Sequence, residues 1–230
     1  MITLASDFGS PYPAAMKGVI RRQTRAEMID IAHDLPRGDP RSAAFWLRFV
    51  LPEFPPAVHC AVVDPGVGTD RDALVVRAGR HVLVAPDNGL AMPPARALAA
   101  EADGDDNGDD NDSGNEDDSE NDFEGDIETY VVDVRNPDSA TFHGRDVFAP
   151  VAARIREAID GGPADATREE IDAALAGMDD LSRASDPVDL VFPEPTVERE
   201  GSEGADADGE RDDTDGDGDR DTADSDGDRD

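Results

Sequence analysis

The chain alternates short apolar runs with segments in which apolar residues recur every three or four positions. The short runs predict β-strands, and the periodic segments predict helices that bury one face. The first group comprises Ile2–Ser6, Met28–Ala32, Ala57–Val63, Ala73–Ala78, His81–Ala85 and Thr129–Val134. The second comprises Ala14–Gln23, Ser42–Leu51, a short helix after the sequence PDNGL, Val147–Ile159 and Arg168–Leu175. Strands alternating with helices predict an α/β layered fold, with a mostly parallel sheet flanked by helices.

Two acidic tracts break this pattern. Residues 101–126 hold 14 acidic residues and no basic one, and residues 198–230 hold 16 acidic residues against four arginines. Such tracts cannot bury enough apolar surface to offset the entropy lost on ordering, so we predict that both are disordered. The expected organisation is one α/β domain over 1–195 with an acidic insert at 101–126, followed by an acidic tail at 196–230.

The net charge of −34 bears on the protein's cellular environment and on its binding partners. Lys17 is the only lysine, against 20 arginines, and a large acidic excess is typical of a salt-rich, halophilic cytoplasm, where ions screen self-repulsion. No basic face is available for nucleic acid, and no apolar run approaches the ~20 residues of a membrane span. The first residues do not resemble a secretory signal, so we expect a cytoplasmic protein. The lone Cys60 fits a core position inside a strand.

Three predicted strands are followed by an acid that has a glycine or proline within two positions, namely Asp7, Asp64 and Asp87. In open α/β sheets, ligands bind in the crevice beyond the carboxyl ends of the strands, so these acids could converge on one cleft. The alternative is that each acid only stabilises its own turn, because Asp and Asn favour turns and helix caps.

His143 lies in a fourth polar cluster, His143-Gly144-Arg145-Asp146, just before a helix. It is a candidate for positioning a reacting water, although the same position suits a plain loop residue beside a helix N-terminus. His33 and His81 fit loop or surface positions, whereas His59 lies within a strand. Because no Cys and His residues have the spacing of zinc ligands, we expect no metal site.

Several motifs, in this order, resemble those of one enzyme family. The first is SDFG followed by a tyrosine and MKGVI, and the second is HDLP. The third is FP followed by VHCAVVDPGVGTDR, the fourth is APDNGL and the fifth is TFHGRDVFAPVAA. The chain resembles the S-adenosyl-L-methionine (SAM) hydroxide adenosyltransferases, or SAM hydrolases, which are relatives of fluorinases and chlorinases. The likeness covers roughly residues 1–195 apart from the acidic insert.

The resemblance implies hydrolysis of SAM to adenosine and methionine, by attack of water or hydroxide on C5′, with no cofactor. The hydrolytic branch is marked by an Asp–Arg–His set, which corresponds here to Asp64, Arg71 and His143. Asp7 corresponds to the acid that binds the ribose hydroxyls. Pro65 and the adjacent glycines would stiffen the turn that carries Asp64, and Arg71 would grip its carboxylate with two bonds.

The family also has a smaller C-terminal β-barrel with a Phe-Gly-Asn segment, and its active sites form in a trimer between the first domain and a neighbour's barrel. We find no Phe-Gly-Asn here, and the acidic tail stands where the barrel is expected. The resemblance therefore leaves two alternatives. One is a hydrolase that borrows a barrel from a separate chain or works weakly alone, with a homotrimer as a possible assembly. The other is a truncated, non-catalytic remnant that binds a nucleoside.

Overall fold

The computed structural model describes residues 1–66, 71–105, 126–134 and 142–192. Residues 1–193 form one compact unit, and a second unit, 194–230, lies outside the described residues. The predicted acidic tail and most of the predicted acidic insert therefore fall outside the part of the chain that the structure describes.

A seven-stranded sheet with the order β2-β1-β3-β5-β4-β6-β7 forms the centre of the described fold. Its strands are β1 (Ile2–Ser6), β2 (Met28–Ala32), β3 (Val58–Val62), β4 (Ala73–Ala78), β5 (His81–Pro86), β6 (Ile127–Val132) and β7 (Leu181–Arg183). Strands β2, β1, β3 and β5 pair in parallel, whereas β5, β4, β6 and β7 pair antiparallel. The α/β prediction is confirmed, and the sheet is mixed, with three parallel and three antiparallel pairings among the described strands, because β4 reverses direction in its hairpin with β5 and then pairs with β6.

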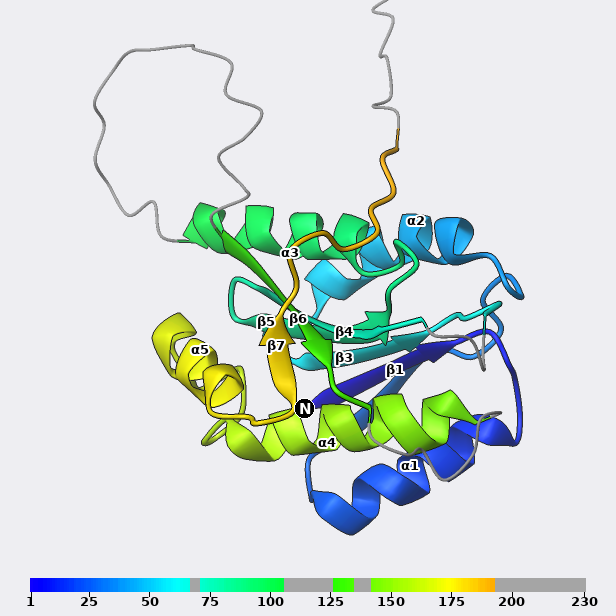
Figure 1. Ribbon diagram of the computed structural model, residues 1–230, viewed down its shortest axis with the longest axis horizontal. Helices are drawn as coiled ribbons and strands as arrows, with labels where there is room; N and C mark the ends of the chain where they lie inside the picture. The colour runs from blue at the N-terminus through cyan, green and yellow to red at the C-terminus, as the bar shows by residue number, and fades with distance from the viewer. Residues whose placement is uncertain (67–70, 106–125, 135–141, 193–230) are drawn as a thin grey trace, which may run out of the picture. The chain divides into compact units, whose positions relative to one another are not determined.

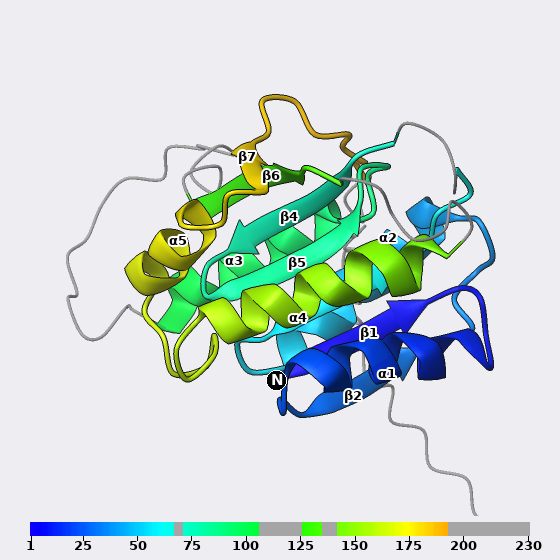
Figure 2. The ribbon, with the colours of Figure 1, turned by 60° about the horizontal axis from the view of Figure 1, so that its bottom comes forward.

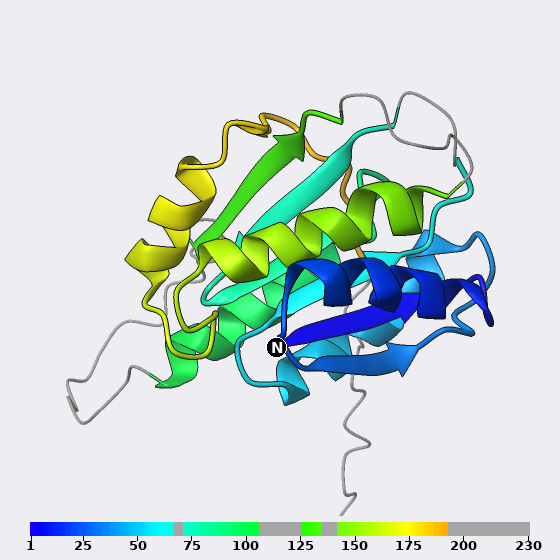
Figure 3. The same ribbon diagram turned by 90° about the horizontal axis from the view of Figure 1, so that it is seen from below.

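Helices cover both faces of this sheet (Figure 1). The helices are α1 (Tyr12–Gln23), α2 (Pro40–Val50), α3 (Met92–Asp105), α4 (Ala149–Ala158) and α5 (Arg168–Ala176), with short turns η1 (Leu51–Glu53) and η3 (Gly144–Phe148). Helices α2 and α3 lie on one face, and α1 and α4 lie side by side on the other, as Figures 2 and 3 also show. None of the described helices combines the length and hydropathy needed to cross a bilayer.

Two apolar cores result from this layering, one on each side of the sheet. Side chains alternate along a strand, so Leu4 and Cys60 face α1 and α4, whereas Ala5 and Ala61 face α2 and α3. Strands covered on both faces read as continuous apolar runs, which is why β1 and β3 are buried at every position. Cys60 lies in the core as predicted, and burial raises the pKa of its thiol to about 12.

Several helix and strand boundaries differ from the predicted ones, and α2 begins at Pro40, before the periodic segment that starts at Ser42. Asp39 caps α2 by accepting a hydrogen bond from the Ser42 amide at 3.0 Å, and Pro40 occupies the first position of the helix. Helix α3 runs to Asp105, into the segment predicted to be disordered, and Asp126 at the other end of that segment is buried. The three-residue strand β7 was not predicted, because its sequence Leu-Ser-Arg carries no strand periodicity.

Buried polar contacts link segments that are distant in sequence. Arg77 of β4 is fully buried, pairs with Asp172 of α5 at 2.6 Å and donates to the Asp126 carbonyl at 2.8 Å. His81, expected at the surface, is instead buried, and its Nδ1 lies 2.9 Å from Nε2 of His59. The prediction for His81 was wrong because a residue next to the Gly79-Arg80 turn is expected at the surface, whereas the first residue of β5 is covered.

Candidate active site

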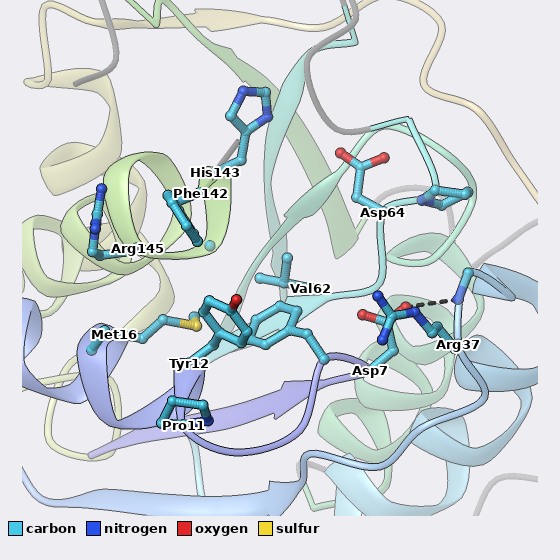
Figure 4. Close-up of a pocket in the computed structure, with 15 residues that line it drawn as sticks. Asp7, Pro11, Tyr12, Met16, Arg37, Val62, Asp64, Phe142, His143 and Arg145 are labelled. Carbon is cyan, nitrogen blue, oxygen red and sulfur yellow. Dashed lines mark hydrogen bonds between the residues drawn. The ribbon is translucent and has the colours of Figure 1, made fainter. Parts of the chain in front are cut away.

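A cavity of about 820 Å³ opens beyond the carboxyl ends of β1 and β3. Its walls come from the loops after β1, β2 and β3, from the first turns of α1, and from η3, and the labelled side chains of Figure 4 project around it. Asp7, Asp64 and His143 all line this cavity. The structure therefore brings together three of the four predicted site residues, from segments up to 136 positions apart.

Asp64 is held close to the sheet by its own turn. Its side chain is only 3% exposed, and its Oδ1 accepts a hydrogen bond from the Gly66 amide at 2.9 Å. Arg71 Nη1 donates to the same oxygen at 3.1 Å, so the predicted Asp–Arg pair is present. The contact is one charge-assisted bond rather than the expected pair of bonds, and Arg71 is not among the residues that line the cavity.

Asp7 lies at another part of the cavity wall, directly after β1. Its Oδ2 accepts a hydrogen bond from the Gly38 amide at 2.7 Å, shown dashed in Figure 4. Gly38 has φ +66°, a left-handed conformation that favours glycine, and a β-carbon added there would touch Pro65. The loops after β1, β2 and β3 therefore meet at Asp7, and Arg37 lines the cavity beside it.

His143 begins the turn that leads into η3 and α4. The amides of Arg145 and Asp146 both donate to the Phe142 carbonyl, which closes this turn. Next to His143, Gly144 lets η3 approach α1, because a β-carbon there would lie 3.1 Å from Phe8 Cζ and 3.2 Å from Met16 Sδ. In Figure 4 the side chains of His143 and Asp64 project toward the same side of the cavity.

An aromatic wall completes the cavity, and the sequence analysis did not identify it. The rings of Phe8 and Tyr12 lie 6.2 Å apart, and those of Tyr12 and Phe142 lie 5.6 Å apart. Tyr12 and Phe142 are 46% and 37% exposed, which leaves ring area for a flat or cationic ligand, and the Arg145 guanidinium lies 4.8 Å from the centre of the Phe142 ring. The available signal was that each ring lies within five positions of a predicted polar site residue.

Asp87 does not join the other strand-end acids. It is absent from the cavity lining, and its Oδ1 accepts a hydrogen bond from the Val188 amide at 2.7 Å. The prediction that three acids converge is therefore wrong for Asp87, which fastens the segment after β7. Within the described part of the chain, no three His, Cys, Asp or Glu side chains cluster as metal ligands would.

Comparison with known proteins relates the chain to one family. The model of the SAM hydroxide adenosyltransferase N-terminal domain matches residues 2–162. The chain is 41% identical over 175 residues to a protein of Salinispora arenicola named (R)-S-adenosyl-L-methionine hydrolase, covering 71% of this chain and 57% of the relative. A protein of the same name from Thermus thermophilus is 40% identical over 160 residues, covering 65% and 54% of the two chains.

The fold is also similar to a solved structure, that of an uncharacterized conserved protein from Thermotoga maritima. The two share 30% sequence identity with a TM-score of 0.57, covering 86% of this chain and 64% of the other. The chain spans a little more than half the length of the curated relatives that it matches. Because the family model covers well over half of its residues, the chain belongs to the SAM hydroxide adenosyltransferase family, through the N-terminal domain of that family.

Proposed function

We propose that the chain hydrolyses SAM to adenosine and L-methionine, by attack of water or hydroxide on C5′. The observation that carries this proposal is the buried carboxylate of Asp64, fixed by two hydrogen bonds at a cavity that His143 and Asp7 also line. The names of the relatives support the same reaction and point to the (R) epimer of SAM as a substrate.

The reaction needs no general acid at the sulfur atom of the substrate. A sulfonium leaves as a neutral thioether, so no group has to donate a proton to it. The oxygen of water forms a bond to C5′ while the C5′–S bond breaks, and the electron pair of that bond stays on sulfur. The proton lost by water passes to Asp64 or His143 and then to solvent. General-base assistance of this kind contributes about 10²–10⁴-fold.

Placement of the water is the main task that remains for the site. Fixing reactants in line can lower a barrier by about 7–11 kcal/mol at best, but only with tight geometry. The Gly66 amide and Arg71 hold the Asp64 carboxylate in one orientation, which would orient a water between it and His143. Asp7 would accept hydrogen bonds from the ribose hydroxyls, and the aromatic wall would contact the adenine ring or the sulfonium.

We further propose that a partner completes the site. Tyr12 and Phe142 line the cavity and are 46% and 37% exposed, so part of a substrate bound against them would stay open to solvent. A second copy of this chain in a trimer, or a separate chain that carries a barrel domain, would supply the missing cover. Asp7, Tyr12 and Phe142 line the cavity and could hold a nucleoside whether or not Asp64 activates a water, so nucleoside binding without turnover is a second candidate function.

The decisive experiment incubates the purified chain with (R)- and (S)-SAM in molar KCl made with ¹⁸O-labelled water. Chromatography with mass detection should find methionine together with adenosine that carries the label on its 5′ oxygen. Titration calorimetry with adenosine runs in parallel. Binding without products would support the second candidate, and neither binding nor products would contradict both. Label in any other product would contradict attack at C5′.

A further inference from the structure

The end of β3 that leads to Asp64 has little backbone support from one side. Strand β3 pairs with β1 along its whole length, but within the described residues it pairs with β5 only at Val58, His59 and Cys60. Strand β5 then ends at Pro86, which has no N–H to donate. The last residues of β3 therefore run toward the cavity beyond their ladder with β5.

Asn88 supplies the support that the ladder lacks. Its Nδ2 donates a hydrogen bond to the Val63 carbonyl at 2.9 Å, as a backbone amide of a neighbouring strand would. Its Oδ1 accepts from the Leu90 amide at 3.2 Å, which fixes which end of the side-chain amide faces Val63. The tight turn that holds Asn88 depends on Gly89, whose φ is +87°.

The Val63 carbonyl belongs to the peptide unit that joins Val63 to Asp64. A hydrogen bond to this carbonyl sets the tilt of that peptide plane, and with it the direction in which the Asp64 side chain leaves the backbone. The Gly66 amide and Arg71 then hold the carboxylate at its other end. We propose that Asn88, which is not part of the cavity lining, is a positioning residue that orients the Asp64 side chain through the Val63 carbonyl.

The expected effect of Asn88 on kcat rests on the proposed hydrolysis. Its expected effect on the position of the Asp64 carboxylate does not. A misplacement of about 1 Å can cost a rate factor of about 10². Loss of the Asn88 donor should therefore lower kcat by about 10- to 100-fold and leave KM nearly unchanged, because Asn88 does not touch the cavity.

Two variants distinguish the loss of the hydrogen-bond donor to Val63 from the loss of the turn that Asn88 stabilises. Asn88→Ala removes both side-chain bonds, whereas Asn88→Asp has nearly the same shape and keeps the acceptor for the Leu90 amide but opposes two oxygens at Val63. If the donor to Val63 is the essential group, both variants should lower kcat to a similar extent. Thr167→Ala serves as the control, because it loses the capping bond to the Glu170 amide at the start of α5, away from the cavity.

A second measurement does not depend on turnover. The Gly66 amide donates to Asp64, so NMR hydrogen exchange at Gly66 reports on the carboxylate's position. Both Asn88 variants should speed Gly66 exchange by about tenfold or more, and Thr167→Ala should not, even at equal loss of global stability. Unchanged Gly66 exchange in Asn88→Asp would overturn the proposal. Absence of turnover in the wild-type chain would contradict the hydrolysis alone, and Gly66 exchange would still decide the role of Asn88.

Discussion

At the scale of single residues, three similar acids after three strands have different roles. Asp64 is buried at the cavity, Asp7 lines the cavity while it binds the Gly38 amide, and Asp87 binds the Val188 amide elsewhere. Their local sequences could not distinguish them, because Asp beside Gly or Pro satisfies the same turn chemistry in each case. The partners of Asp7 and Asp87 come from distant segments, whereas Asp64 binds Gly66 and Arg71 close by in its own sequence.

Replacement of Asp64 tests its role directly. Asp64→Asn keeps an oxygen that can accept from the Gly66 amide but removes the negative charge and the ability to take a proton. We expect kcat to fall by about 10²–10⁴-fold in the SAM assay. Circular dichroism and thermal unfolding should stay close to those of the wild-type chain. A variant that folds and turns over at the wild-type rate would contradict the proposed role.

Asp7 should affect binding more than chemistry. Asp7→Asn retains an acceptor for the Gly38 amide but weakens hydrogen bonds from the ribose hydroxyls, since bonds to charged groups are stronger by about 1 kcal/mol or more. We expect the Kd for adenosine to rise by about tenfold in calorimetry. The same measurement with 2′,3′-dideoxyadenosine, which lacks the ribose hydroxyls, is the control. If Asp7→Asn raised its Kd as much as it raised the Kd for adenosine, Asp7 would not be the ribose ligand.

At the scale of elements, close approach between η3 and α1 shapes the cavity wall. Gly144 occupies the contact, with the Phe8 ring and Met16 sulfur within 3.2 Å of where a β-carbon would stand. The sequence shows glycine at a helix start, where a cap or a turn would explain it equally well. Only the packing of η3 on Phe8 and Met16 identifies a steric reason.

Substitution of this glycine should therefore be unfavourable. Gly144→Ala forces Phe8 and Met16 to shift by a few tenths of an ångström, and overpacking of this kind typically costs about 1–3 kcal/mol. Gly18→Ala in α1 is the matched control, because an added β-carbon meets nothing within 4 Å and the helix should gain about 1 kcal/mol. Urea unfolding measures both changes. Equal stability of the two variants would contradict the steric role of Gly144.

At the scale of the whole molecule, a buried polar chain crosses the sheet from β1 to β5. Thr3 Oγ1 lies 2.8 Å from His59 Nδ1, and His59 Nε2 lies 2.9 Å from His81 Nδ1. Burial, reinforced by Arg80, lowers the pKa of His81 to about 4, and burial with the neighbouring His81 lowers the pKa of His59 well below 6.5. Both rings are therefore neutral in the folded protein at neutral pH.

This pair makes folding stability sensitive to acid. The unfolded chain binds protons on these rings near pH 6.5 and the folded chain does not, so their contribution is complete above pH 6.5 and is lost as pH falls toward 4. His81 alone should account for a loss of the order of 3 kcal/mol. Urea unfolding between pH 7 and pH 4.5 should show this slope, and His81→Gln should reduce it. A ring of His81 that titrates near pH 6.5 by NMR would contradict the prediction.

The sequence by itself determined the order and type of most elements, the family and the identity of Asp7, Asp64, Arg71 and His143 as candidate site residues. These follow from information that is local along the chain, namely apolar periodicity, turn residues and motifs. Tertiary structure decided which side chains share a cavity, that Asp87 lies outside it, that His81 is buried and that Asn88 donates to the Val63 carbonyl. Those outcomes depend on contacts between segments far apart in the chain, which no local pattern encodes.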